Sequence, residues 1–75
     1  MPNIYTSLIA EATGATGLRA DAIDDHMRGY TGGVLDSLSR AEFIKLARRC
    51  DKELRDPEML KLVRMNPRFK DLEGP

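Results

Sequence analysis

The chain has 75 residues, of which 41% are hydrophobic and 32% charged, and its 12 basic and 12 acidic residues give a formal net charge of zero. This composition is typical of a globular domain and excludes an intrinsically disordered chain, and the length allows one domain at most. Cys50 is the only cysteine, so an internal disulfide is excluded. Cys50 and His26 are too few soft ligands for structural zinc, which takes four, and we expect neither a metal nor a cofactor.

The sequence predicts a cytoplasmic protein without a membrane segment. No apolar run approaches the length that spans a bilayer. The N-terminal stretch lacks the basic region and the long apolar run of a secretory signal. A lone cysteine also fits a reducing compartment.

Charge is distributed unevenly along the chain. Residues 1–38 hold two basic and five acidic side chains, a charge of −3, whereas residues 39–75 hold ten basic and seven acidic ones, a charge of +3. Such asymmetry is typical of a protein with two different faces, although a short chain also acquires it by chance.

The first predicted helix covers residues 4–13. Asn3 is a suitable N-cap, and Gly14 can adopt the left-handed conformation that closes a helix. The apolar residues recur at helical spacing: Ile4, Leu8, Ile9 and Ala12.

A second predicted helix covers residues 20–28. Leu18 and Ile23 are spaced like the hydrophobic staple that sets the entry angle of a helix. Gly29 is a natural stop, and the Tyr-Thr-Gly-Gly sequence of residues 30–33 predicts a flexible connection.

The third predicted helix has the clearest start in the chain. Ser39 and Glu42 fit the capping box, and Leu38 and Phe43 fit the accompanying staple. We expect this helix to run to about Arg55. Its apolar stripe is Phe43, Leu46, Ala47, Cys50 and Leu54.

A fourth predicted helix starts at Pro57, with Asp56 as its cap. It should end near Met65, because Asn66 precedes Pro67 and is pushed away from the helical conformation. No stretch alternates between apolar and polar residues in the way that indicates a strand.

These elements predict an all-α protein, a small bundle of three to four short helices around a single core. Residues 1–66 would form the helical domain. Residues 67–75 would form an irregular C-terminal tail, with Phe69 and Leu72 as docking points. The predicted core is Leu8, Ile9, Ile23, Met27, Leu38, Phe43, Leu46, Cys50, Leu54, Leu60 and Val63.

The sequence offers little for catalysis, and we expect no enzyme and no catalytic residue. Cys50 lies on an apolar stripe, where a cysteine is usually a small core residue rather than a nucleophile. His26 is interpreted as a solvated or capping side chain, with a pH-sensitive contact as the alternative. Asp24 and Asp25 are neighbours on a helix and therefore point in different directions, so they form no paired carboxylate site.

The sharpest surface feature is a set of basic residues on the third predicted helix. At about 100° per residue they project opposite the apolar stripe, with no acidic residue among them. We call this set the basic face: Lys45, Arg48, Arg49, Lys52 and Arg55. It suits an acidic protein surface or a phosphate backbone, and an ordinary solubilising face is the alternative. Tyr30, an aromatic residue beside a glycine turn, is the second candidate contact.

The first two predicted helices also allow a helix-turn-helix interpretation. In that motif the second helix reads DNA, but here it carries Asp21, Asp24 and Asp25, which a phosphate-lined groove would repel. A nucleic-acid contact would therefore have to come from the third helix. We expect a protein partner with an acidic surface. Nucleic acid and self-association stay open as alternatives.

Residues 8–33 read LIAEATGATGLRADAIDDHMRGYTGG. This segment resembles a helical segment of the large polyvalent proteins of phages and mobile elements. In those proteins a stretch similar to Ala12-Thr13-Gly14 precedes the string that matches best. The resembling string is Ile23-Asp24 followed by Arg28-Gly29-Tyr30-Thr31-Gly32-Gly33. His26 departs from that pattern, which has an apolar residue there. The resemblance implies a phage or mobile-element origin and transfers no catalytic residue. A protein of that origin would act in a bacterial host cell, as an inhibitor, an adaptor or a component of a larger assembly.

Overall fold

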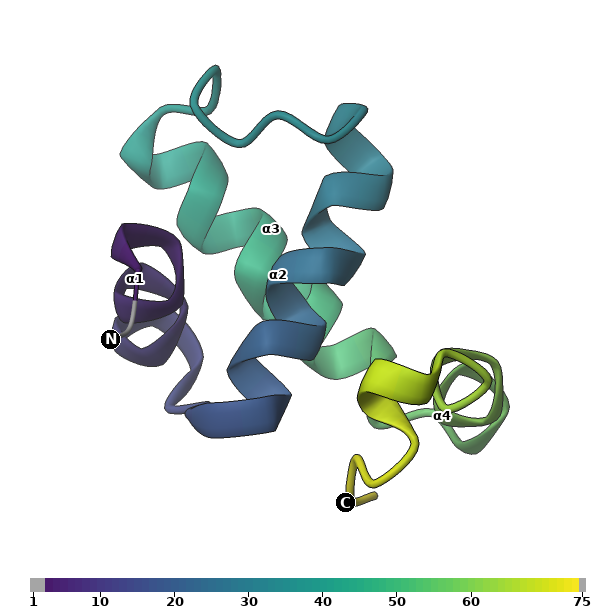
Figure 1. Cartoon of the computed structure of the whole chain (residues 1–75). Helices are drawn as coiled ribbons and strands as arrows, with labels where there is room; N and C mark the ends of the chain where they lie inside the picture. Colours follow the sequence, from purple (N-terminus) through teal and green to yellow (C-terminus); the bar gives the residue numbers. More distant parts are fainter. Residues whose placement is uncertain (1–2, 75) are drawn as a thin grey trace.

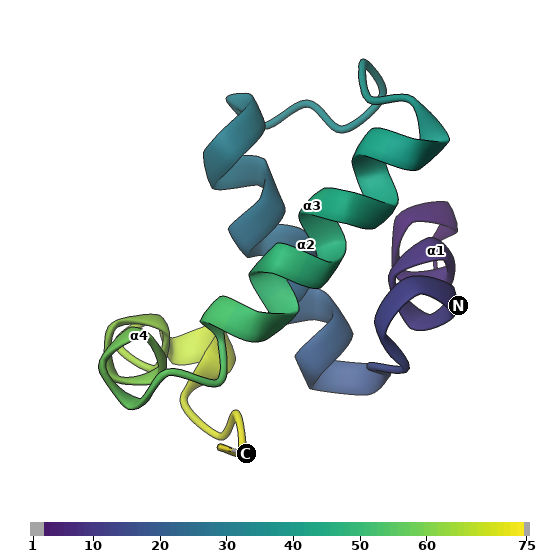
Figure 2. The ribbon, with the colours of Figure 1, turned by 180° about the vertical axis from the view of Figure 1, so that it is seen from behind.

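A computed structural model describes residues 3–74 of the chain. Its elements in order are α1 (Ile4–Thr13), α2 (Gly17–Thr31), α3 (Arg40–Glu53), α4 (Pro57–Val63) and the short 3-10 helix η1 (Pro67–Phe69). Each of α1, α2 and α3 packs against the other two, and α4 with η1 lies beside the C-terminal end of α3 (Figures 1 and 2). The predicted all-α bundle is confirmed, and residues 3–74 contain no strand.

The bounds of α1 agree with the prediction. The Asn3 Oδ1 atom accepts a hydrogen bond of 2.8 Å from the backbone N–H of Thr6. At the other end Gly14 has a φ of 80°, and its N–H donates to the carbonyl of Ala10. The polar side chain at one end and the residue without a Cβ at the other therefore determine where this helix starts and stops.

The second helix is longer at both ends than predicted, and Gly29 does not stop it. The left-handed C-cap is Gly32, with a φ of 69°. Arg28 explains the extension, because its side chain bonds both to a residue within α2 and to the backbone just after its C-cap. Its Nε donates to Asp24 over 2.6 Å, and its guanidinium also donates to the carbonyl of Gly33 over 3.0 Å. These bonds offset the cost of about 1 kcal/mol that a glycine imposes inside a helix.

The capping box of α3 is present. The Glu42 carboxylate accepts a hydrogen bond of 2.9 Å from the Ser39 N–H, and the Ser39 hydroxyl accepts one of 3.1 Å from the Glu42 N–H. The helix ends at Glu53 rather than near Arg55. Four residues of its apolar stripe are buried and Leu46 is half-buried; the buried four are Phe43, Ala47, Cys50 and Leu54.

Replacing Ser39 by alanine is expected to lower the free energy of unfolding by about 0.5–2 kcal/mol, because a backbone donor at the start of α3 loses its partner. Glu42→Ala should cost less, and the double variant should cost less than the sum of the two. Urea unfolding at neutral pH measures all three, and full additivity would contradict a reciprocal box.

The effect of Glu42 should depend on pH. The hydrogen bond from the Ser39 backbone is the main cause that lowers the pKa of Glu42. A carboxyl group whose folded pKa is lowered stabilises the fold above its unfolded pKa, and this stabilisation is lost as the pH falls through the folded pKa. Glu42→Ala and the natural sequence should therefore converge in stability at acidic pH.

The C-terminal segment contributes to the core. The helix α4 ends at Val63, earlier than the predicted Met65. The predicted tail starts with the single turn of η1, and its last residue, Pro75, lies outside the described residues. Phe69 and Leu72 are 1% and 3% exposed. The Arg64 Nε holds the chain back against α4 by donating to the Leu72 carbonyl over 2.7 Å.

The core is one cluster that all the elements share. Its buried members are Ile9, Ala15, Ala20, Ala22, Ile23, Met27, Leu35, Phe43, Ala47, Cys50, Leu54, Leu60, Phe69 and Leu72. Four residues of the predicted core are only half-buried and pack against it: Leu8, Leu38, Leu46 and Val63. Within the described part of the chain, none of the helices has the length and hydropathy that a membrane span requires.

Candidate functional site

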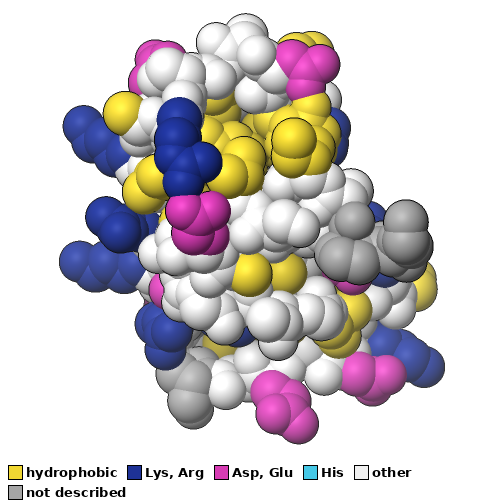
Figure 3. All heavy atoms as spheres, turned by 90° about the vertical axis from the view of Figure 1, so that its left-hand side faces the viewer, with side chains coloured by type: hydrophobic (Ala, Val, Ile, Leu, Met, Phe, Trp, Pro, Cys, Tyr) yellow, Lys and Arg dark blue, Asp and Glu magenta, His cyan; other side chains and the backbone are white. Residues whose placement is uncertain are grey.

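Four residues of the basic face lie on the solvent side of α3, Arg55 lies in the turn that follows the helix, and all five are exposed. The opposite side of the helix carries the buried stripe that packs against α1 and α2. In the space-filling view, Lys and Arg side chains gather along the left-hand edge, where the outer side of α3 lies (Figure 3). The helical periodicity of the sequence therefore placed these residues on the correct side.

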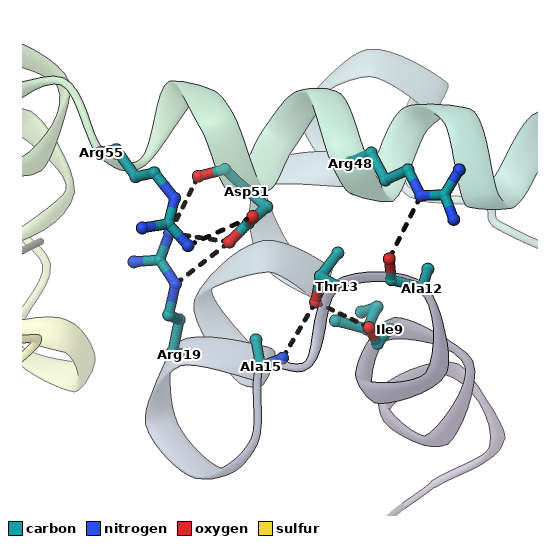
Figure 4. Close-up of polar contacts among 8 residues, drawn as sticks. All are labelled: Ile9, Ala12, Thr13, Ala15, Arg19, Arg48, Asp51 and Arg55. Atoms are coloured by element: carbon teal, nitrogen blue, oxygen red, sulfur yellow. Dashed lines mark hydrogen bonds and ion pairs between the residues drawn. The ribbon is translucent and has the colours of Figure 1, made fainter.

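Arg48 connects the basic face to α1. Its Nε donates a hydrogen bond of 3.2 Å to the carbonyl of Ala12, in the last turn of α1 (Figure 4). The last carbonyls of a helix have no partner within the helix, so this bond satisfies one of them. The contact drawn for Arg48 comes from Nε alone, and neither terminal nitrogen of the guanidinium has a partner in this view (Figure 4). Arg48 is thus tethered to α1 through Nε, and its two terminal nitrogens have no hydrogen-bond partner among residues 3–74 and remain available as donors.

Arg55 shares a carboxylate with a basic residue of α2. Arg19 donates to Asp51 through Nε over 3.2 Å and through a terminal nitrogen over 2.9 Å, and it also donates to the Asp51 backbone carbonyl over 2.8 Å. Arg55 lies 3.5 Å from the other carboxylate oxygen (Figure 4). One negative charge therefore meets two positive charges, and a charge of +1 remains. Arg19 was not among the predicted residues of this surface.

Arg49 and Tyr30 belong to a different cluster, centred on Glu53. The guanidinium of Arg49 lies 3.5 Å from the Glu53 carboxylate and 5.0 Å from the centroid of the Tyr30 ring. The Tyr30 hydroxyl donates to the Glu53 carboxylate over 2.7 Å, and the His26 Nε2 atom lies 2.9 Å from the same carboxylate. Tyr30 is 48% exposed, but its hydroxyl is already engaged within the protein.

The hydrogen bonds of this cluster determine the protonation of Glu53 and Tyr30. The bond from Tyr30 is the main cause that lowers the pKa of Glu53, with His26 and Arg49 adding to it against the effect of burial. The same bond raises the pKa of Tyr30. At neutral pH the carboxylate is therefore ionised and the phenol is protonated, so Glu53 accepts from both Tyr30 and His26.

The centre of the basic face remains open. Lys45, Arg48 and Lys52, which we call the basic triplet, are exposed on adjacent turns of α3. Within residues 3–74 none of the three forms an ion pair with a carboxylate. Arg49 and Arg55, by contrast, each have an acidic partner four residues away in the sequence: Glu53 for Arg49 and Asp51 for Arg55. The predicted face thus divides into an open centre and paired flanks.

Cys50 faces the core, as its place on the apolar stripe predicted. Its side chain is fully buried, and this burial raises the pKa of the thiol to about 12. The thiol is therefore protonated at neutral pH, and a protonated thiol is a poor nucleophile.

Comparisons with known proteins give no relative for this chain: no family model matches it, and neither a curated protein nor a solved structure resembles it significantly. Its function has to be argued from its own surface.

Proposed function

We propose that this protein is a small helical binding module, without catalytic activity of its own, that presents the basic triplet to an acidic surface of a partner protein. The observation that carries the proposal is the contrast in charge pairing along α3. The arginines on the flanks are matched by internal carboxylates, whereas Lys45, Arg48 and Lys52 are not. A cluster of unmatched positive charge on a rigid helix is complementary to a cluster of negative charge.

The orientation of Arg48 supports this proposal. A free arginine loses rotamer freedom when it binds a partner, and this entropy loss weakens the complex. Here the bond from its Nε to the carbonyl of Ala12 restrains the side chain before binding. The two terminal nitrogens, which Nε leaves unused, can then donate in parallel to the two oxygens of one carboxylate.

The size of the open patch favours protein over nucleic acid. Lys45 and Lys52 are seven residues apart, which corresponds to about 10 Å along a helix. Carboxylates border this patch on α3 itself: Glu42, Asp51 and Glu53. Nucleic-acid binding usually requires a broader positive field, and the formal net charge here is zero. A short positive patch with acidic borders fits a few carboxylates better than a phosphate backbone.

The resemblance of residues 8–33 to a segment of phage and mobile-element proteins supports a host-directed role. On this proposal the partner is a protein of the bacterial host cell or of the element itself. The chain would act on it as an inhibitor, as an adaptor or as a component of a larger assembly.

Reversal of two charges on the patch tests the proposal. A partner is first captured from bacterial lysate, with and without nuclease. Replacing both Lys45 and Lys52 by glutamate should weaken binding to that partner by about 10- to 100-fold, because attraction across the interface becomes repulsion. The fold should be retained, because exposed helix positions tolerate such changes. Titration calorimetry measures the affinity, and circular dichroism checks the fold.

The matched control is the double variant Lys61→Glu, Lys70→Glu. It makes the same change in net charge at exposed positions outside α3, so it should leave the affinity nearly unchanged. Equal losses in the two double variants would contradict a localised site. Capture that nuclease abolishes, together with affinity that falls steeply with salt, would favour nucleic acid instead.

A further inference from the structure

Three different kinds of metal-binding atom meet between α2 and α3. They are an imidazole nitrogen of His26, the Sγ atom of Cys50 and a carboxylate oxygen of Glu53, and all lie within 4.8 Å of one another. His26 comes from α2, whereas Cys50 and Glu53 come from α3, where a separation of three residues places them on one side of the helix. Their convergence depends on the packing of the two helices.

We propose that His26, Cys50 and Glu53 form a binding site for a divalent transition-metal ion, with Zn²⁺ as the best match. Zinc takes thiolate, imidazole and carboxylate ligands, whereas calcium and magnesium prefer oxygen ligands alone. Three protein ligands leave one position of a tetrahedral ion for a further ligand. This number is typical of zinc sites that bind a further ligand rather than of closed structural sites.

Two of the three ligands are partly exposed to solvent, and the third is buried. The side chains of His26 and Glu53 are 20% and 27% exposed, so an ion can reach them from solvent. The Cys50 side chain is fully buried, with its Sγ atom within 4.8 Å of the ligand atoms of the other two. The Tyr30 hydroxyl, which donates to Glu53, would orient this ligand from outside in the way that supporting residues commonly do in metal sites.

Metal binding has to displace protons that the cluster now holds. The ionised Glu53 carboxylate accepts from His26, so the proton lies on Nε2. Coordination through Nε2 requires this proton to move to Nδ1, which leaves the imidazole neutral. The Cys50 thiol loses its proton to solvent as the sulfur–metal bond forms, so one proton is released for each ion bound.

Two features oppose the ion. Burial raises the pKa of the Cys50 thiol to about 12, and the positive Arg49 guanidinium lies 3.5 Å from Glu53.

The test uses Co²⁺ and Zn²⁺ as the probes, added to the full chain under reducing conditions. Co²⁺ should give thiolate-to-cobalt charge-transfer absorption that saturates at one ion per chain, and Zn²⁺ should remove it. Zn²⁺ should also raise the melting temperature, because an ion that binds only the folded state stabilises it. The absence of charge-transfer absorption in the natural sequence would overturn the proposal.

Two ligand variants and two controls locate the site. His26→Gln and Cys50→Ala should each bind Zn²⁺ at least about tenfold more weakly. The loss of a residue that only hydrogen-bonds to a metal ligand already lowers metal affinity by about tenfold or more, and the loss of a ligand should cost no less. Asp25→Asn, which removes an exposed carboxylate beside His26, should retain binding, and Arg49→Gln, which removes a positive charge next to Glu53, should bind Zn²⁺ at least as tightly as the natural sequence.

His26→Gln keeps the test decisive if Cys50→Ala destabilises the core, because His26 is only partly buried. Undiminished Zn²⁺ affinity in a folded His26→Gln variant would contradict the assignment. Equal loss in Arg49→Gln and His26→Gln would contradict it as well.

Discussion

Replacing Phe43 by alanine is expected to destabilise the fold by about 3–5 kcal/mol. The side chain is 3% exposed and stacks on Tyr5 of α1, with the ring centroids 6.2 Å apart and the planes inclined by 19°. The substitution removes this contact between α1 and α3 and leaves a cavity at the start of α3. A chain of 75 residues has a total stability of about 4–11 kcal/mol, so a large part of it would be lost.

Chemical unfolding monitored by circular dichroism measures this loss. Ile4→Ala is the matched control, because it truncates a large aliphatic side chain on α1 that is 70% exposed. The control should change stability by no more than about 0.5 kcal/mol. If Phe43→Ala unfolded at the same denaturant concentration as the natural sequence, the packing of Phe43 between α1 and α3 would be contradicted.

A loss of similar size, about 3–5 kcal/mol, is expected for Phe69→Ala. Phe69 lies in η1, outside the three central helices, but it is only 1% exposed. The guanidinium of Arg68 lies 5.1 Å from its ring centroid and covers it. Removal of the ring leaves Leu60 and Leu72, members of the same buried cluster, without part of their apolar surroundings.

The control for Phe69→Ala is Met65→Ala, in the preceding turn, where the side chain is 77% exposed. Thermal melting and limited proteolysis of the C-terminal segment should both separate the two variants. Equal resistance of Phe69→Ala and the natural sequence to unfolding would show that residues 67–75 are a tail without a role in stability, as the division at residue 66 implies.

The features that sequence reasoning identified best are those that local chemistry determines. A capping box needs only Ser39 and Glu42 three positions apart, and Gly14 needs only its own backbone freedom. The end of α2 shows the limit of this approach. Gly29 and Gly32 are both good stops by residue type, and Arg28 decides between them through a bond to the carbonyl of Gly33.

Burial of the C-terminal segment was harder to foresee. Phe69 and Leu72 lack helical periodicity, because they lie in and after a single 3-10 turn. The sequence marked them as docking points but could not show that they join the core. Leu35 was expected to supply apolar contacts in the connection between α2 and α3, but it was left out of the predicted core, although it is 3% exposed.

The sequence predicted which side of α3 carries the basic residues, but it did not predict their long-range hydrogen-bond partners. Periodicity alone places the basic residues opposite the buried stripe of α3. Arg48 bonds to Ala12, and Arg19 bonds to Asp51, the partner of Arg55; both bonds join residues more than 30 positions apart and form only through tertiary packing. The proximity of His26 to Cys50 likewise follows from the packing of α2 against α3. The pairs Arg49–Glu53 and Asp51–Arg55, four residues apart, could have been read from the sequence, whereas the approach of His26 and Tyr30 to Glu53 could not.

The two sides of α3 have a consequence for how this protein can diverge. The inner stripe is tied to α1 and α2 through buried side chains, so most changes there reduce folding stability. Lys45 and Lys52 are exposed, and an exchange at either position carries little folding penalty. Binding specificity can therefore drift or be redesigned at these outer positions while the architecture stays constant, which makes α3 a small scaffold for retargeting.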